Sequence, residues 1–135
     1  MTLETAFTME MSNIKYGPGV TREIGQDLKS YGVKRLMVVT DENLVDKEPV
    51  LVALESLKKA NIEAVVFDKV RVEPTDQSFN EAIQFASNGN FDGYLGIGGG
   101  SSLDTAKAAN LYATYPADLL TYVNPPIGKG QPIPG

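Results

Sequence analysis

Short apolar runs alternate with stretches of helical periodicity along most of this sequence. The runs at 35–40, 62–67 and 91–97 have the length and composition of buried β-strands, and a helical pattern follows each of them. Strands and helices that alternate in this way form βαβ units, in which crossover helices join parallel strands. The sequence therefore predicts an α/β fold with an open, mostly parallel sheet and helices on both faces.

Turn residues and spacing set the expected limits and faces of several elements. Residues 7–11 alternate apolar and polar side chains, which predicts a further strand with one buried face. Gly32 stands where a glycine would end the first helix, whose apolar residues recur at helical spacing from Val20 to Tyr31. The helix after residue 100 is expected to turn four residues inward: Leu103, Ala106, Asn110 and Ala113.

The composition excludes several classes of function. The chain has 135 residues, 42% of them hydrophobic, and no apolar run long enough to span a membrane. Seventeen acidic and twelve basic residues give a net charge of −5, which argues against a nucleic acid as partner. Because the sequence has no histidine and no cysteine, it cannot supply imidazole or thiolate metal ligands, a disulfide or a Ser-His-Asp centre. We expect no catalytic and no metal-binding residue in it.

The two ends of the sequence bear on location and on domain limits. The first basic residue is Lys15, and no signal or transit peptide is visible, so a cytoplasmic location is expected. Five of the eight prolines lie in the last twenty residues, together with three glycines. This change in composition predicts one domain over residues 1–115 and a Pro/Gly-rich connection over 116–135, within which the chain is cut off.

The strongest local signal is the glycine run at 98–100, between a strand pattern and a helix pattern. Glycine lets a ligand approach the backbone, and a helix start offers unpaired N–H groups and a positive dipole end. This predicts an anion site suited to a pyrophosphate, to which Ser101 and Ser102 could add hydroxyl donors. The alternative is a tight turn in which Ser101 and Asp104 form a capping box. The run is neither a G-x-G-x-x-G fingerprint nor a P-loop.

Three further polar residues are expected near the ligand edge of the sheet. Asp41 could accept hydrogen bonds from an adenosine ribose and repel a 2′-phosphate, or it could be a solvated helix-start residue. Thr75 could contact a cofactor or cap the helix that follows it. Lys107 could reach the mouth of the site or pair with Asp104 at i, i+3.

Four motifs together resemble the N-terminal domain of the iron-containing (group III) alcohol dehydrogenases. They are Tyr-Gly-Pro-Gly at 16–19, Val-Thr-Asp at 39–41, Glu-Pro-Thr at 73–75 and Gly-Gly-Gly-Ser-x-x-Asp-x-x-Lys at 98–107. The resemblance extends along essentially the whole chain. Three further segments are closer still to the hydroxyacid–oxoacid transhydrogenase branch of that family: 70–76, 107–113 and 126–130.

The resemblance implies an NAD-binding domain with a Rossmann-like sheet, in which the glycine run cradles the pyrophosphate and Asp41 favours NAD over NADP. In the family, a following all-helical domain holds iron or zinc through Asp and His ligands. The parent enzyme, an expected homo-oligomer, would then move a hydride between the cofactor and a small alcohol or hydroxyacid. This sequence is truncated before that domain and has Glu73 where the family often has Asn. Alone, it is expected to bind NAD without turnover.

The predicted cofactor-binding residues are Asp41, Thr75, Gly98, Gly99, Gly100, Ser101, Ser102, Asp104 and Lys107. Two other functions remain open. One is the cofactor domain of a related glycerol dehydrogenase or dehydroquinate synthase. The other is a receiver-like signalling domain, against which the triple glycine argues because such a domain has no use for it.

Overall fold

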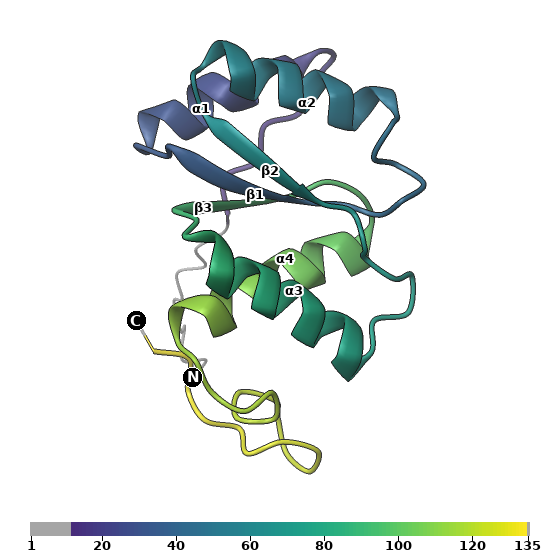
Figure 1. Cartoon of the computed structure of the whole chain (residues 1–135), viewed down its shortest axis with the longest axis vertical. Helices are drawn as coiled ribbons and strands as arrows, with labels where there is room; N and C mark the ends of the chain where they lie inside the picture. The colour runs from purple at the N-terminus through teal and green to yellow at the C-terminus, as the bar shows by residue number, and fades with distance from the viewer. Residues whose placement is uncertain (1–11, 135) are drawn as a thin grey trace, which may run out of the picture.

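Three parallel strands form the centre of the part that the computed structural model describes, residues 12–134. They are β1 (Arg35–Val39), β2 (Glu63–Phe67) and β3 (Gly93–Gly96), in the order β2-β1-β3 (Figure 1). Both strand pairs are parallel, so the predicted α/β fold is confirmed. The strand predicted at 7–11 lies outside the described residues.

Helices cover both faces of this sheet. The described helices are the 3-10 helix η1 (Val20–Glu23), α1 (Ile24–Ser30), α2 (Glu48–Lys59), α3 (Asp76–Gly89) and α4 (Gly100–Thr114). Helices α1 and α2 lie over one face, and α3 and α4 lie over the other (Figure 1). The loops that leave β1 and β3 therefore run to opposite faces, which is where open α/β sheets bind ligands. None of these helices is long and apolar enough to cross a membrane.

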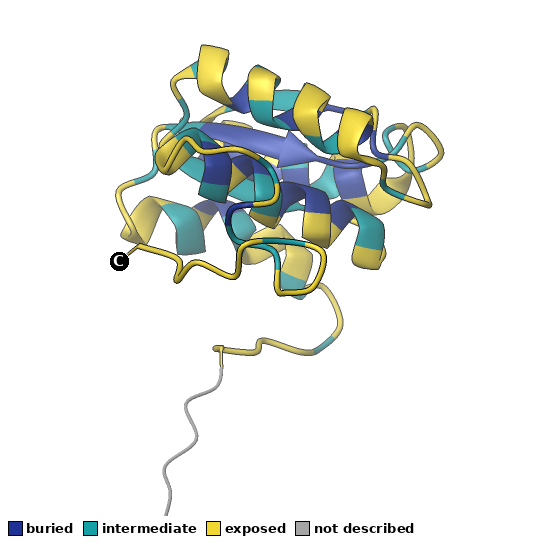
Figure 2. Cartoon of the chain, turned by 90° about the horizontal axis from the view of Figure 1, so that it is seen from below, coloured by how far each residue is buried: buried dark blue, intermediate teal, exposed yellow. Residues whose placement is uncertain are grey.

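Strand β1 is the centre of the hydrophobic core because it is covered on both faces. Leu36, Met37, Val38 and Val39 are fully buried. Met37 and Val39 pack with residues of α3 and α4, while Leu36 and Val38 pack with residues of α1 and α2. Figure 2 shows the buried sheet between helices whose outer faces are exposed. Burial of each such side chain contributes about 1.5–3 kcal/mol to folding.

Helix α1 ends at the predicted glycine. Gly32 has a φ of 80°, and its N–H donates to the carbonyl oxygen of Lys29 (2.9 Å). The N–H of Val33 donates to the carbonyl oxygen of Leu28 (3.2 Å), which completes a Schellman motif. Tyr31 lies beyond the last helical residue, and its side chain is exposed.

Helix α4 turns only two of the four predicted residues inward: Ala106 is buried and Ala113 packs against the core, but the other two are not. Leu103 is 43% exposed and Asn110 is also exposed. The buried residues of α4 are Ser102, Thr105, Ala106, Ala109 and Tyr112. Small residues on this face let α4 approach α3, where Ala82 and Ala86 belong to the same core cluster. Alanine and hydroxyl residues form only a weak apolar pattern. The larger Leu103 therefore dominates the apolar spacing of this segment, although its side chain is exposed.

The residues after α4 fold back through turns instead of forming an open connection. Over 116–131, one of several backbone hydrogen bonds runs from the N–H of Lys129 to the carbonyl oxygen of Leu120 (2.9 Å). The hydroxyl of Tyr112 donates to the carbonyl oxygen of Leu119, which attaches this segment to α4. The domain limit between residues 115 and 116 stays a prediction.

Candidate cofactor-binding site

Thr40 joins the loops that follow β1 and β3 at the carboxyl edge of the sheet. Its buried hydroxyl donates to the carbonyl oxygen of Ile97 (2.9 Å), and its N–H donates to that of Phe67 (2.9 Å). Because Thr40 precedes Asp41 and Ile97 precedes Gly98, these bonds hold two of the predicted site residues at the same edge. The structure thus places the end of β1 beside the glycine run, as the βαβ pattern predicts.

The three glycines before and at the start of α4 have different surroundings. Gly98 has a φ of +143°, and a Cβ there would lie 2.8 Å from Oγ of Ser102, so the backbone and the packing both require glycine. A Cβ at Gly99 or Gly100 would meet no atom of the described residues within 4 Å. The φ of Gly99 is −80°, which any residue adopts. The fold gives no reason for glycine at 99 and 100, and their open surroundings leave a ligand free to approach the backbone.

The first turn of α4 offers backbone donors to this open space. Within residues 12–134, the N–H groups of Gly100 and Ser101 have no hydrogen-bond acceptor, and no side chain caps the helix. The 15-residue helix adds the positive end of its dipole. The alternative capping box is wrong, because the helix begins at Gly100 and Ser101 is already inside it. Asp104 is exposed on the outer face.

The side chains of the two serines of this turn are withheld from a ligand in different ways: that of Ser101 is hydrogen-bonded within the protein, and that of Ser102 is buried. Oγ of Ser101 donates to the carbonyl oxygen of Val72, 2.6 Å away in the loop between β2 and α3. Ser102 is 1% exposed and lies under Gly98. In this structure neither hydroxyl is free to donate to a ligand in the way that the sequence suggested. The N–H of Ser102 also donates within the protein, to the carbonyl oxygen of Gly99 (3.1 Å), so the available contribution of the two serines is the backbone N–H of Ser101.

The carboxylate of Asp41 organises the loop that follows β1. Its Oδ1 accepts from the N–H of Asn43 (2.8 Å) and the N–H of Leu44 (3.0 Å). A Cβ on Gly98 would lie 3.3 Å from Cδ1 of Leu44, so this loop contacts the glycine run. Asp41 is partly buried, and Oδ2 has no hydrogen-bond partner within the described chain. The turn role and a ribose-binding role are compatible because they use different oxygens.

Thr75 has the helix-capping role. Its Oγ1 accepts from the N–H of Ser78 (3.2 Å), and the hydroxyl of Ser78 accepts from the N–H of Thr75 (2.8 Å), which makes a reciprocal capping box. The contact of Thr75 with a cofactor stays a prediction.

Asp104 and Lys107 are not brought together at the glycine run. Both are exposed on α4, and no ion pair between them occurs among the residues that the structure describes. Lys107 lines a separate hollow of about 470 Å³ with Asn110 of α4, with Tyr115 just after that helix and with Ile133. In this structure, Lys107 therefore lies beside the terminal segment and not at the glycine run.

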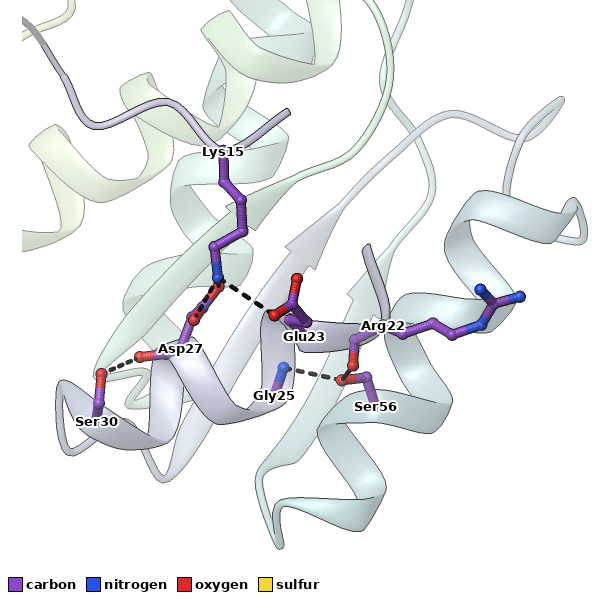
Figure 3. A network of polar contacts seen from close by, with 7 residues as sticks. All are labelled: Lys15, Arg22, Glu23, Gly25, Asp27, Ser30 and Ser56. Carbon is purple, nitrogen blue, oxygen red and sulfur yellow. Dashed lines mark hydrogen bonds and ion pairs between the residues drawn. The ribbon is translucent and has the colours of Figure 1, made fainter. Parts of the chain in front are cut away.

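Sequence reasoning missed a cleft of about 340 Å³ beside the glycine run. Ile24 and Ala53 line it from the helices, Leu95 lines it from β3, and Gly98 stands at its edge. Its charged lining residue is Lys15, whose Nζ lies 2.7 and 2.9 Å from the carboxylate oxygens of Asp27 (Figure 3). The hydrogen bond to Asp27 raises the pKa of Lys15. The motif at 16–19 directly follows Lys15 but gave no indication that this lysine lines a cleft.

A close contact between α1 and α2 fixes the helical wall of this cleft (Figure 3). The hydroxyl of Ser56 donates to the carbonyl oxygen of Arg22 (2.7 Å) and accepts from the N–H of Gly25 (2.9 Å). A Cβ at Gly25 would lie 2.2 Å from the carbonyl oxygen of Ser56. Glycine alone permits this approach, and a larger residue would push the two helices apart.

Known relatives share more than half of their aligned residues with this chain. It is 56% identical to the mitochondrial hydroxyacid-oxoacid transhydrogenases of Xenopus tropicalis, over 131 residues, and of Homo sapiens, over 133 residues. The alignments cover 96% and 98% of this chain but 28% of each relative. The chain therefore spans less than a third of the length of these relatives.

The same relatives correct the expected location. They are named as mitochondrial proteins, so the expectation of a cytoplasmic location was wrong and the mitochondrion is indicated instead. The expectation depended on the lack of a visible transit pattern. Such a lack is no positive evidence for any compartment.

Solved structures agree with the fold. The chain matches the NADH-dependent butanol dehydrogenase A of Thermotoga maritima with a TM-score of 0.78 and a 1,3-propanediol oxidoreductase with a TM-score of 0.76, each at 30% identity. These matches cover 85% and 80% of this chain and 29% and 28% of the other chains. A family model described as iron-containing alcohol dehydrogenase matches residues 12–134. This chain belongs to the iron-containing alcohol dehydrogenase family.

Proposed function

We propose that this chain is the NAD-binding part of a metal-dependent oxidoreductase that transfers a hydride between the cofactor and an alcohol or hydroxyacid. The observation that carries the proposal is the space at Gly99 and Gly100, which is open within residues 12–134, beside the N–H groups at the start of α4 that have no acceptor in the same range. A pyrophosphate fits there because the donors, the helix dipole and the lack of Cβ atoms all favour an anion close to the backbone. The names of the relatives support a nicotinamide cofactor and substrates of these two classes.

Asp41 is proposed to hold the adenosine ribose. One carboxylate oxygen keeps the loop after β1 in place, and the other is available to accept from ribose hydroxyls. A 2′-phosphate at the same place would be repelled by the carboxylate. NAD is therefore the proposed cofactor in preference to NADP.

A bound NAD would supply the hydride acceptor, and the residues described above would bind and orient it.

The metal of an iron-containing enzyme does not fit this chain. The sequence has no histidine or cysteine, and within residues 12–134 no three acidic side chains are grouped so that they could hold a metal ion. We therefore propose that residues 1–115 form a cofactor domain and that the metal and the substrate are bound outside these 135 residues. The complete enzyme is proposed to be a homo-oligomer.

Calorimetric titration of NAD into the wild-type chain and into Gly99→Val tests this function. Valine fits the backbone angles at 99 but would occupy the space proposed for the pyrophosphate, so the affinity should fall at least about tenfold while the fold is kept. Gln77→Val is the matched control, because it adds the same side chain to the exposed first turn of α3. Lack of NAD binding by the wild type, or equal affinity in folded Gly99→Val, would contradict the proposal.

A further inference from the structure

The hydroxyl of Ser101 bridges two segments that are 29 residues apart in the chain. Its Oγ lies 2.6 Å from the carbonyl oxygen of Val72, in the loop between β2 and α3. A serine hydroxyl has a single proton to donate, and this bond uses it. Ser101 also supplies one of the two N–H groups at the start of α4 that have no acceptor among the described residues. The loop and the proposed pyrophosphate site are therefore joined at one residue.

The loop needs such an attachment because little else holds its middle. At one end Val70 is buried, and its N–H donates to the carbonyl oxygen of Thr40 (3.4 Å). At the other end the capping box of Thr75 and Ser78 begins α3. Between them the side chain of Val72 is 79% exposed and contributes little apolar packing. The hydrogen bond from Ser101 lies at this weakly packed point.

The same loop forms one wall of a polar hollow at the carboxyl ends of β1 and β2. The hollow has a volume of about 450 Å³, with Lys69 and Arg71 from the loop and Glu42 from the segment after β1. Glu42 directly follows Asp41, the proposed ribose ligand. Movement of the loop would therefore change the shape and the charge beside the position proposed for the adenosine.

We propose that Ser101 is a positioning residue, which fastens the loop at 70–75 to the first turn of α4 so that the cofactor site is formed before NAD arrives. The role rests on the proposed function. Its benefit is preorganisation, because a loop that is already ordered in the free protein loses less conformational freedom on binding. Ser101 then contributes its backbone N–H to the pyrophosphate and its hydroxyl to the loop.

Trypsin cleavage of the free protein, together with NAD titration, tests this role. The bond between Arg71 and Val72 is a tryptic site inside the loop, and the bond after Lys129 is an exposed control site outside it. Ser101→Ala should speed cleavage after Arg71 about 5- to 10-fold, leave cleavage after Lys129 unchanged and weaken NAD binding by a similar factor. Ser101→Thr keeps the hydroxyl and should restore both measurements.

The possible results separate this role from the proposed function. Weaker NAD binding without faster cleavage in the free protein would show that the hydroxyl acts on the ligand, which overturns the positioning role alone. Faster cleavage with unchanged NAD affinity would show that the attachment does not serve the site, which overturns it equally. Failure of the wild-type protein to bind NAD would overturn the proposed function and this role together.

Discussion

The carboxylate of Asp92, just before β3, accepts a hydrogen bond from the backbone N–H of Arg35 at the start of β1 (2.9 Å). It also accepts from the N–H of Lys34, and the N–H of Asp92 donates to the carbonyl oxygen of Arg35 (3.0 Å). The two strands are thus joined where they begin. The hydrogen bond from Arg35, followed by that from Lys34, holds the pKa of Asp92 below its ordinary value.

Asp92→Asn should lower the free energy of unfolding at neutral pH by about 1 kcal/mol, a small value because the carboxylate is exposed. The folded pKa lies below the unfolded one. The contribution is therefore complete above the ordinary Asp pKa of about 4 and is lost as the pH falls through the folded value. Urea unfolding of both proteins at about pH 7 and about pH 2.5 should show the difference shrinking in acid. A difference of equal size at both pH values would rule out a contribution from the charge.

Gly98→Ala and Gly100→Ala should separate folding from binding. Alanine at 98 meets Ser102 and a φ of +143°, so the free energy of unfolding should fall by about 1–3 kcal/mol. Alanine at 100 meets nothing, so stability should hold or rise by no more than about 1 kcal/mol. NAD should nevertheless bind Gly100→Ala about tenfold more weakly, because the methyl group keeps the pyrophosphate from the backbone. Urea unfolding and calorimetry measure the two effects. Full NAD affinity in Gly100→Ala would contradict the proposed cradle.

Replacement of Asp41 should change the choice between NAD and NADP. Charged hydrogen bonds to a ribose contribute roughly 1.5–3 kcal/mol, so Asp41→Gly should weaken NAD about 10- to 150-fold, while NADP weakens less or improves. Asp41→Asn is the sharper variant, because its amide oxygen can still accept from Asn43 and Leu44 while the charge is gone. Paired dissociation constants for both cofactors provide the measurement. An unchanged ratio in Asp41→Asn would place the ribose elsewhere.

The 135-residue chain alone should not oxidise alcohols or hydroxyacids. It has no histidine or cysteine to hold a metal, and added iron or zinc should not change the result. The measurement is NADH absorbance after incubation with 4-hydroxybutyrate and with simple alcohols, with a denatured sample as control. Steady NADH production by the purified chain would show that the catalytic groups are present after all.

Local patterns were sufficient for most of the elements. The apolar runs predicted β1, β2 and β3 close to their observed places, and Gly32 and Thr75 stand at helix ends as expected. The inner face of α4 was predicted only in part: Ala106 and Ala113 face the core, but Leu103 is exposed, because packing against α3 selects small residues and a count of apolar spacing favours the larger leucine.

Contacts between distant segments could not be predicted from spacing. Ser101 and Lys15 illustrate this limit. Ser101 follows the glycine run, but its spacing does not reveal that its hydroxyl is bonded to a carbonyl group 29 residues earlier. Lys15 precedes the motif at 16–19 but is not part of it, and the arrangement of η1, α1 and β3 brings it to the cleft. The residues proposed for the site are local in sequence, and the contacts that hold them in place are not.

The position of β1 between two distant partners has a consequence for the synthesis of the chain. Arg35 is 28 residues from Glu63, its neighbour on β2, and Thr40 is 57 residues from Ile97, its partner after β3. Parallel pairings at such separations form slowly, because loop closure is costly before the contacts stabilise the chain. While the polypeptide emerges from the ribosome, Met37 and Val39 of β1 stay uncovered until α3 and α4, which pack against them, have been made. During that interval the nascent chain depends most on chaperones to avoid aggregation.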